Sequence, residues 1–155
     1  SALGLKFSWV GKHSLFNGIA GKVVTFIGGI PVNRKSRNSF LVGMVNAFRL
    51  RDELTLALAP EGTRSKQNHW KAGFYHISVE ANIPICFGFV DYSTKTVGIG
   101  PTLHPSKDIK ADFSVIQEFY RDKTVKYPDK QSSISLRAKE IVLLQKKYPV
   151  NPPPS

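Results

Sequence analysis

The residues best suited to chemistry lie in one short segment, Glu61-Gly62-Thr63-Arg64. This segment follows the apolar run at residues 54–58, which predicts a buried strand, and Pro60 breaks the strand so that the polar side chains enter a loop. In open α/β sheets, ligands are held at the carboxyl ends of the strands. Arg64 carries a planar fork of donors that suits a phosphate or a carboxylate. The segment therefore predicts an anion site, and the alternative is an ordinary loop with a surface ion pair.

The neighbours of Arg64 fit the same chemistry. Glu61 is placed to orient the guanidinium, and Gly62 permits a ligand to approach the backbone closely. Lys71-Ala72-Gly73 leads into a predicted helix whose apolar face is formed by Phe74, Ile77, Ser78 and Ala81. Free backbone N–H groups and the helix dipole at such an amino terminus both favour an anion.

Other kinds of site find little support in the sequence. The four histidines show no paired spacing with acidic residues or with Cys86 that would predict a metal centre; they are His13, His69, His76 and His104. No nucleophile-elbow motif and no phosphate-binding P-loop is present. The lone Cys86 excludes an intramolecular disulfide and predicts a buried thiol in the strand around it.

The composition is that of a basic globular protein. The 155 residues include 22 Lys and Arg against 11 Asp and Glu, a formal net charge of +11. That excess indicates an anionic partner, which is nucleic acid, an acidic membrane surface or a phosphorylated substrate. The longest apolar stretch, residues 23–32, is too short to span a membrane. The single Cys86 fits a reducing setting, and we expect a cytoplasmic protein.

The pattern of apolar residues predicts an α/β fold, a single domain with one mixed β-sheet flanked by helices. We expect strands near residues 5–10, 30–33, 54–59, 84–91 and 96–100, the last two joined as a hairpin by a turn at 91–95. Helices are expected at 15–27, after a cap at Asn38 or Ser39, after Trp70-Lys71-Ala72-Gly73, after a capping box at 114–117, and at 135–147. The second of these has one apolar face, formed by Leu41, Met44, Val45 and Phe48. The domain is expected to cover residues 1–148, with a proline-rich tail at 149–155.

Three segments resemble conserved blocks of the glycerolipid acyltransferases, the family of 1-acylglycerol-3-phosphate acyltransferases. Pro60-Glu61-Gly62-Thr63-Arg64-Ser65 resembles the third block, Gly28-Gly29-Ile30-Pro31-Val32-Asn33-Arg34 the second, and Ile83-Pro84-Ile85 the fourth. Lys12 and Lys71 also stand where the family pattern has lysines. The resemblance implies a glycerol-3-phosphate acyltransferase-like fold and, for the full-length protein, a peripheral place at the membrane.

The resemblance also implies a reaction. In this family a histidine, oriented by an aspartate from which four residues separate it, takes the proton from an acceptor hydroxyl that attacks an acyl thioester. The donor is acyl-CoA or acyl carrier protein, no cofactor is needed, and the acceptor is a lysophospholipid or a glycerol phosphate at an anionic membrane surface. The implied substrate-binding residues are Arg34, Glu61, Gly62, Thr63, Arg64, Lys12 and Lys71. The arginines would hold the phosphate of the acceptor.

The catalytic pair itself is absent from these residues. Five positions after the four histidines stand Gly18, Phe74, Ala81 and Ile109, and none is an aspartate. We therefore expect the substrate-binding body of an acyltransferase, a fragment that is inactive alone. A natural non-catalytic relative that binds lipid phosphate or an acyl carrier is the first alternative, and a basic nucleic-acid-binding domain is the second.

Overall fold

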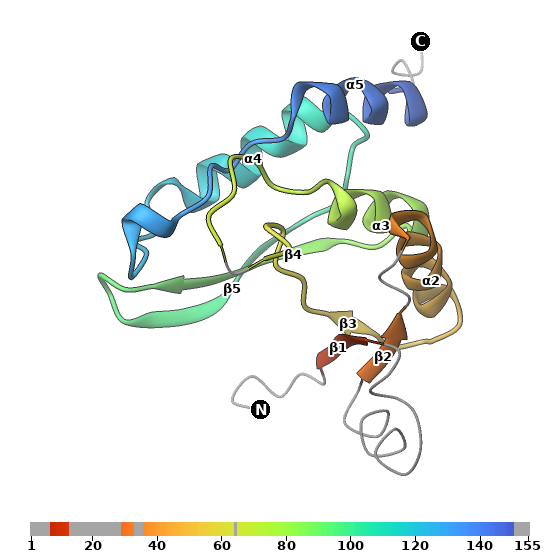
Figure 1. The fold of residues 1–155 in the computed structure, drawn as a ribbon, viewed down its shortest axis with the longest axis horizontal. Helices are drawn as coiled ribbons and strands as arrows, with labels where there is room; N and C mark the ends of the chain where they lie inside the picture. The colour runs from red at the N-terminus through yellow and green to blue at the C-terminus, as the bar shows by residue number, and fades with distance from the viewer. Residues whose placement is uncertain (1–6, 13–28, 33–35, 64, 151–155) are drawn as a thin grey trace. The chain divides into compact units, whose positions relative to one another are not determined.

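The computed structural model describes residues 7–12, 29–32, 36–63 and 65–150, and for the first two ranges it describes the backbone alone. The chain forms two compact units, Ser1–Ala59 and Pro60–Ser155, and Figure 1 shows the elements of each. The predicted helix at 15–27 and most of the proline-rich tail lie outside the described residues.

The first unit contains a small parallel sheet. Strands β1 (Phe7–Lys12), β2 (Gly29–Val32) and β3 (Thr55–Leu56) form it in the order β2-β1-β3. The strands predicted near 5–10 and 30–33 are confirmed. The buried strand predicted at 54–59 is wrong in extent, because only two residues pair with β1 and the apolar residues after them lead towards the turn at Pro60. The side chains of Ala57, Leu58 and Ala59 are exposed.

Helix α2 (Arg37–Arg49) completes the described part of this unit. Its cap is Ser36 and not the predicted Asn38 or Ser39, because Ser36 has an extended backbone and its Oγ accepts a hydrogen bond from the Ser39 N–H at 3.4 Å. The predicted apolar face is confirmed, since Met44 and Val45 are buried.

The second unit consists of three helices and a hairpin. Its elements are α3 (Gly73–Ala81), β4 (Ile85–Asp91), β5 (Thr96–Leu103), α4 (Ile109–Arg121), the short 3₁₀ helix η2 (Pro128–Lys130) and α5 (Ala138–Lys147). Strands β4 and β5 pair antiparallel, as the predicted hairpin requires. The prediction of one mixed sheet is wrong for the described strands, because β4 and β5 pair with each other through a tight turn and form a sheet of their own. The described fold is therefore mixed α/β with two small sheets.

Hydrogen bonds to Asp91 hold the turn of this hairpin. Its carboxylate accepts bonds from the Ser93 N–H at 3.0 Å and from the Ser93 hydroxyl at 2.7 Å. These bonds favour the ionised form, so the Ser93 hydroxyl, followed by the backbone N–H groups, holds the pKa of Asp91 below its usual value. The Asp91 carboxylate thus stabilises the turn by accepting these hydrogen bonds.

The core of the second unit lies between the hairpin and its three helices. Its buried members are Ala72, Tyr75, Phe87, Ile109, Phe113, Ile116, Leu136, Leu144 and Tyr148. Alternation along β4 turns Phe87 into this core and Cys86 to the other face, so the predicted burial of the Cys86 thiol is wrong. A Cβ at Gly100 would collide with the ring of Phe119, which indicates how closely β5 approaches α4.

A buried polar cluster ties α3 to α4 within this core. The Tyr75 hydroxyl donates to Asp112 Oδ2 at 2.7 Å, and Ser106 donates to the same carboxylate through its N–H at 2.8 Å and its hydroxyl at 2.7 Å. Burial, and then the bond to Asp112, raise the pKa of Tyr75 far above its usual value. The buried carboxylate is thus satisfied by three donors.

Helices α4 and α5 begin elsewhere than the sequence predicts. Helix α4 starts well before the predicted capping box, because Asp108 accepts bonds from the N–H groups of Lys110 and Ala111. Ser114, the predicted cap, donates to the Lys110 carbonyl inside the helix instead. Helix α5 begins at Ala138, later than the predicted residue 135.

Among the described residues, no helix has the length and apolar character needed to cross a membrane.

Candidate functional site

The structure describes part of the predicted substrate-binding set. Glu61, Gly62, Thr63 and Lys71 are described with their side chains, and Lys12 is described only as the last backbone position of β1. Arg34 and Arg64 lie outside the described residues, so their meeting at one phosphate stays a prediction.

The loop at Pro60–Thr63 closes against the start of α3. The Lys71 N–H donates to the Pro60 carbonyl at 2.8 Å, and Gly62 has a left-handed backbone with φ of 67°. A Cβ placed on Gly62 would lie 2.7 Å from Lys71 Nζ. The loop backbone at Gly62 and the ammonium group of Lys71 therefore lie close together, as an anion site requires.

This geometry makes Gly62 sensitive to substitution. We expect Gly62→Ala to lower the free energy of unfolding by about 1 kcal/mol, because an L side chain is strained at this φ and its Cβ would displace Lys71. Gly62→Asn should recover part of the loss, since asparagine tolerates the left-handed region. Urea unfolding measures both variants. Gly88→Ala is the matched control because a Cβ there meets nothing within 4 Å, and an equal loss in that variant would contradict the explanation.

The segment after the loop is anchored to a distant part of the chain. The Gln67 N–H donates to Ser132 Oγ at 2.8 Å and the Trp70 N–H donates to the Ser135 carbonyl at 2.8 Å. Lys66 Nζ donates to the Asp129 carbonyl at 3.1 Å. Residues 65–69 look merely polar and exposed in the sequence, and no local pattern indicates these bonds because the partners are far apart in the chain.

The amino end of α3 has no side-chain cap. Its boundary residue is Ala72, which is buried and carries no oxygen that could accept from the first turn. The helix then begins with Gly73, two residues after Lys71. The helix predicted to follow Trp70-Lys71-Ala72-Gly73 is confirmed, and the free backbone donors of its first turn follow Lys71 closely in sequence.

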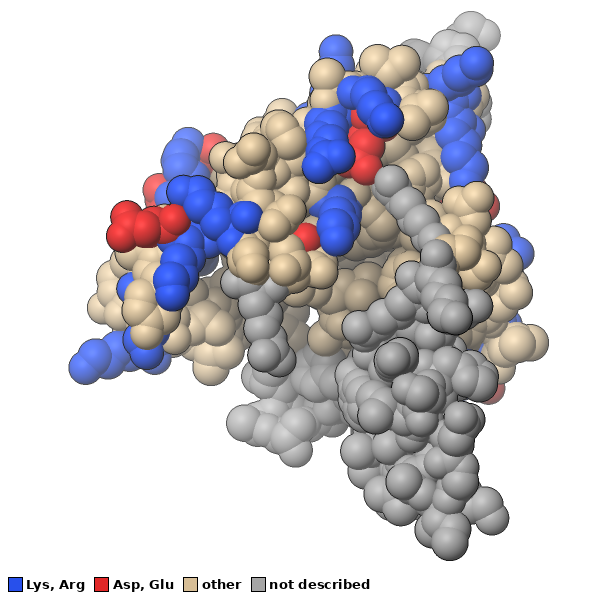
Figure 2. Space-filling view, viewed as in Figure 1, with Lys and Arg blue, Asp and Glu red and all other residues tan. Residues whose placement is uncertain are grey.

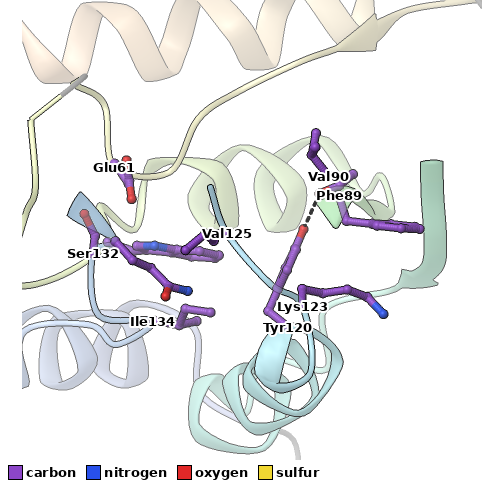
Figure 3. A pocket seen from close by; sticks show the side chains of 11 residues that line it. Glu61, Phe89, Val90, Tyr120, Lys123, Val125, Ser132 and Ile134 are labelled. Carbon is purple, nitrogen blue, oxygen red and sulfur yellow. Dashed lines mark hydrogen bonds between the residues drawn. The ribbon is translucent and has the colours of Figure 1, made fainter. Parts of the chain in front are cut away.

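A cavity of about 190 Å³ lies beside Glu61, the one predicted site residue that lines it (Figure 3). Most of its wall is apolar or aromatic and comes from Trp70, Phe89, Tyr120, Val125 and Ile134. Trp70 packs edge-on against Tyr120, with ring centroids 5.8 Å apart. Sequence reasoning missed this cavity, because its wall is assembled from five separate segments of the second unit.

Two of the described histidines, His69 and His76, make hydrogen bonds that serve the fold. His69 Nδ1 lies 3.0 Å from Ser135 Oγ. The Tyr148 hydroxyl donates to Glu80 Oε1 at 2.8 Å, so His76 Nδ1, which lies 3.0 Å from that hydroxyl, is the donor of the second bond. The hydrogen bond of His76 is thus satisfied within the fold. Within the described ranges, no group of three His, Cys, Asp or Glu side chains could hold a metal ion.

The described surface is predominantly basic on the face shown in Figure 2. Lysine and arginine side chains cover more of that face than aspartate and glutamate do, in agreement with the formal net charge of +11. Several lysines rest over aromatic rings, and Lys123 Nζ lies 5.1 Å from the centre of the Phe89 ring. This surface favours an anionic ligand without selecting one.

Comparison with known proteins identifies the family. The family model described as Acyltransferase matches residues 3–86, more than half of the chain and a range that contains the loop at Glu61–Thr63. The chain therefore belongs to the acyltransferase family. Neither the search of the curated proteins nor that of the solved structures found a match.

Proposed function

We propose that this chain binds a lysophosphatidate-like phospholipid as the acceptor of an acyl group from acyl-CoA or acyl carrier protein. The observation that carries the proposal is the family match over residues 3–86, which includes both segments that bear the predicted arginines and the loop between Pro60 and Lys71. The same relationship supports a glycerol-3-phosphate acyltransferase-like fold and a place for the protein at an anionic membrane surface.

The proposed site binds the phosphate by charge and by backbone donors. Arg34 and Arg64 form charge-assisted hydrogen bonds to phosphate oxygens, and Lys71, beside Gly62, adds a point charge. Glu61 orients the guanidinium of Arg64, and Lys12 contributes a further positive charge from the end of β1. Holding the phosphate in this way fixes the position of the acceptor hydroxyl.

The proposed reaction is acyl transfer to that hydroxyl. A base removes the hydroxyl proton, the oxygen bonds to the acyl carbon, and the C–S bond of the thioester breaks as the thiol takes up a proton. The family's histidine-x4-aspartate pair is not among the 155 residues. The residues present are therefore proposed to bind and orient the acceptor, and none of them is proposed to act as the base.

Calorimetric titration tests this function. We expect lysophosphatidate and glycerol 3-phosphate to bind, with inorganic phosphate in competition, whereas glycerol should not bind because the site recognises the phosphate. A random single-stranded oligonucleotide at the same ionic strength is the control, since its phosphates present the same charge without the glycerol. Comparable affinity for the oligonucleotide would contradict the proposal and favour a nucleic-acid-binding protein.

A further inference from the structure

The cavity beside Glu61 has an interior that suits an apolar group. The two hydroxyls in its wall are already engaged, since the Tyr120 hydroxyl donates to the Gly88 carbonyl at 2.8 Å and Ser132 Oγ accepts from the Gln67 N–H at 2.8 Å. The rest of the wall is mainly aromatic and aliphatic, and its other uncharged polar side chains are Gln131 and the indole of Trp70. Burial of a hydrocarbon group against such a wall is favourable.

The charged residues of the wall do not oppose this conclusion. Figure 3 shows the Lys123 ammonium directed away from Glu61, Val125 and Ile134. It lies 5.1 Å and 5.3 Å from the centres of the Phe89 and Phe119 rings, which stabilise it at the edge of the cavity. The methylene stem of a lysine held in this way adds to an apolar wall. The other charged residue of the wall is Glu61, which belongs to the loop.

We propose that this cavity holds the hydrocarbon chain of the phospholipid acceptor. The inference rests on the proposed function, because the phosphate is placed at the loop and Glu61 belongs both to the loop and to the wall of the cavity. A monoacylated glycerol phosphate joins a phosphate to an acyl chain through a short glycerol. Its chain therefore begins beside the loop and passes Trp70 and Val125 along the apolar wall.

The wall also lies largely outside the part of the chain that matches the family. The match ends at residue 86, whereas the wall residues other than Glu61 and Trp70 come from Gly88 onwards. The cavity is thus contributed by a segment that the family relationship does not describe. We assign to it a role in selecting among acceptors by their chains.

Quenching of tryptophan fluorescence by a brominated lipid tests the assignment. The chain has two tryptophans, so Trp9→Phe leaves Trp70, in the wall of the cavity, as the reporter. We expect brominated lysophosphatidate, below its micelle concentration, to quench Trp70, and brominated acyl-CoA to quench it much less. Circular dichroism establishes that the variant is folded.

A substitution that fills the cavity provides the second measurement. Val125→Phe in the Trp9→Phe chain should weaken lysophosphatidate binding about tenfold and reduce the quenching, because added volume excludes the chain. Val142→Phe is the matched control, since Val142 lies on α5 with 62% of its surface exposed. Binding of glycerol 3-phosphate should be the same in both variants, because this ligand has no chain.

The results separate this inference from the proposed function. Loss of glycerol 3-phosphate binding in Arg64→Ala tests the phosphate site alone, whereas the response to Val125→Phe tests the cavity alone. Quenching that survives Val125→Phe, or absence of quenching in the folded Trp9→Phe chain, would overturn the inference. Stronger quenching by brominated acyl-CoA than by brominated lysophosphatidate would overturn it as well, since the cavity would then hold the donor's chain.

Discussion

Incubated with acyl-CoA and lysophosphatidate, the 155-residue chain is expected to release no free thiol above the uncatalysed rate. An acceptor hydroxyl is a poor nucleophile at neutral pH, and a positioned base contributes about 10²–10⁴-fold to such a reaction. No histidine of the chain has an aspartate at the family's spacing, and the Nδ1 atom of His76 is engaged with the Tyr148 hydroxyl. A lysine stays protonated unless it is strongly desolvated.

The assay follows thiol release with a colorimetric thiol reagent, with and without the acceptor. An active 1-acylglycerol-3-phosphate acyltransferase at equal concentration serves as the positive control, so that a silent assay is not mistaken for an inactive chain. Thiol release that depends on the acceptor would contradict the expectation. The variants His76→Ala and His13→Ala would then be assayed, and loss of activity in one of them would show which histidine is the base.

The second large effect is expected at Arg64. Arg64→Ala should weaken binding of lysophosphatidate by on the order of 2 kcal/mol, the range of hydrogen bonds to charged groups. Arg64→Lys should restore only part of the affinity, because an ammonium keeps the charge but lacks the bidentate fork. Isothermal titration with lysophosphatidate and with glycerol 3-phosphate measures both effects.

The charge change of Arg64→Ala needs a control of its own. Lys146→Ala removes one positive charge from the exposed last turn of α5 and leaves the loop intact. Its binding should match that of the parent chain at physiological ionic strength, where distant surface charges are screened. Equal affinity of the parent chain and both Arg64 variants would show that this arginine does not contact the phosphate.

The local parts of the fold were predictable from the sequence. The hairpin of β4 and β5 follows from two strand-like runs around a polar turn, and the apolar face of α2 follows from helical spacing. The start of α4 could not be predicted from the sequence, because Asp108 and Ser114 both suit a cap and only the backbone conformation decides between them. The exposure of Cys86 likewise depends on which face of β4 meets the helices.

The candidate site shows the same division. The loop at Gly62 and its proximity to Lys71 come from neighbouring residues, and a glycine after a proline predicts such a turn. The cavity depends on Tyr120, Val125 and Ile134 reaching Trp70, and these positions share no motif. Contacts between distant segments are set by packing, which the order of residues alone does not specify.

The bonds that anchor residues 66–70 have a consequence for how the protein is made. Gln67 and its partner Ser132 are 65 residues apart, so the ribosome delivers the loop long before it delivers the residues that hold it. Closing so long a segment is entropically costly, and contacts of this kind form late in folding. The nascent chain therefore carries the family's loop residues in an unanchored form until its carboxyl-terminal third has emerged. A chain cut before Asp129 would keep all the residues of the family match and would lack the partners that shape the segment behind the loop.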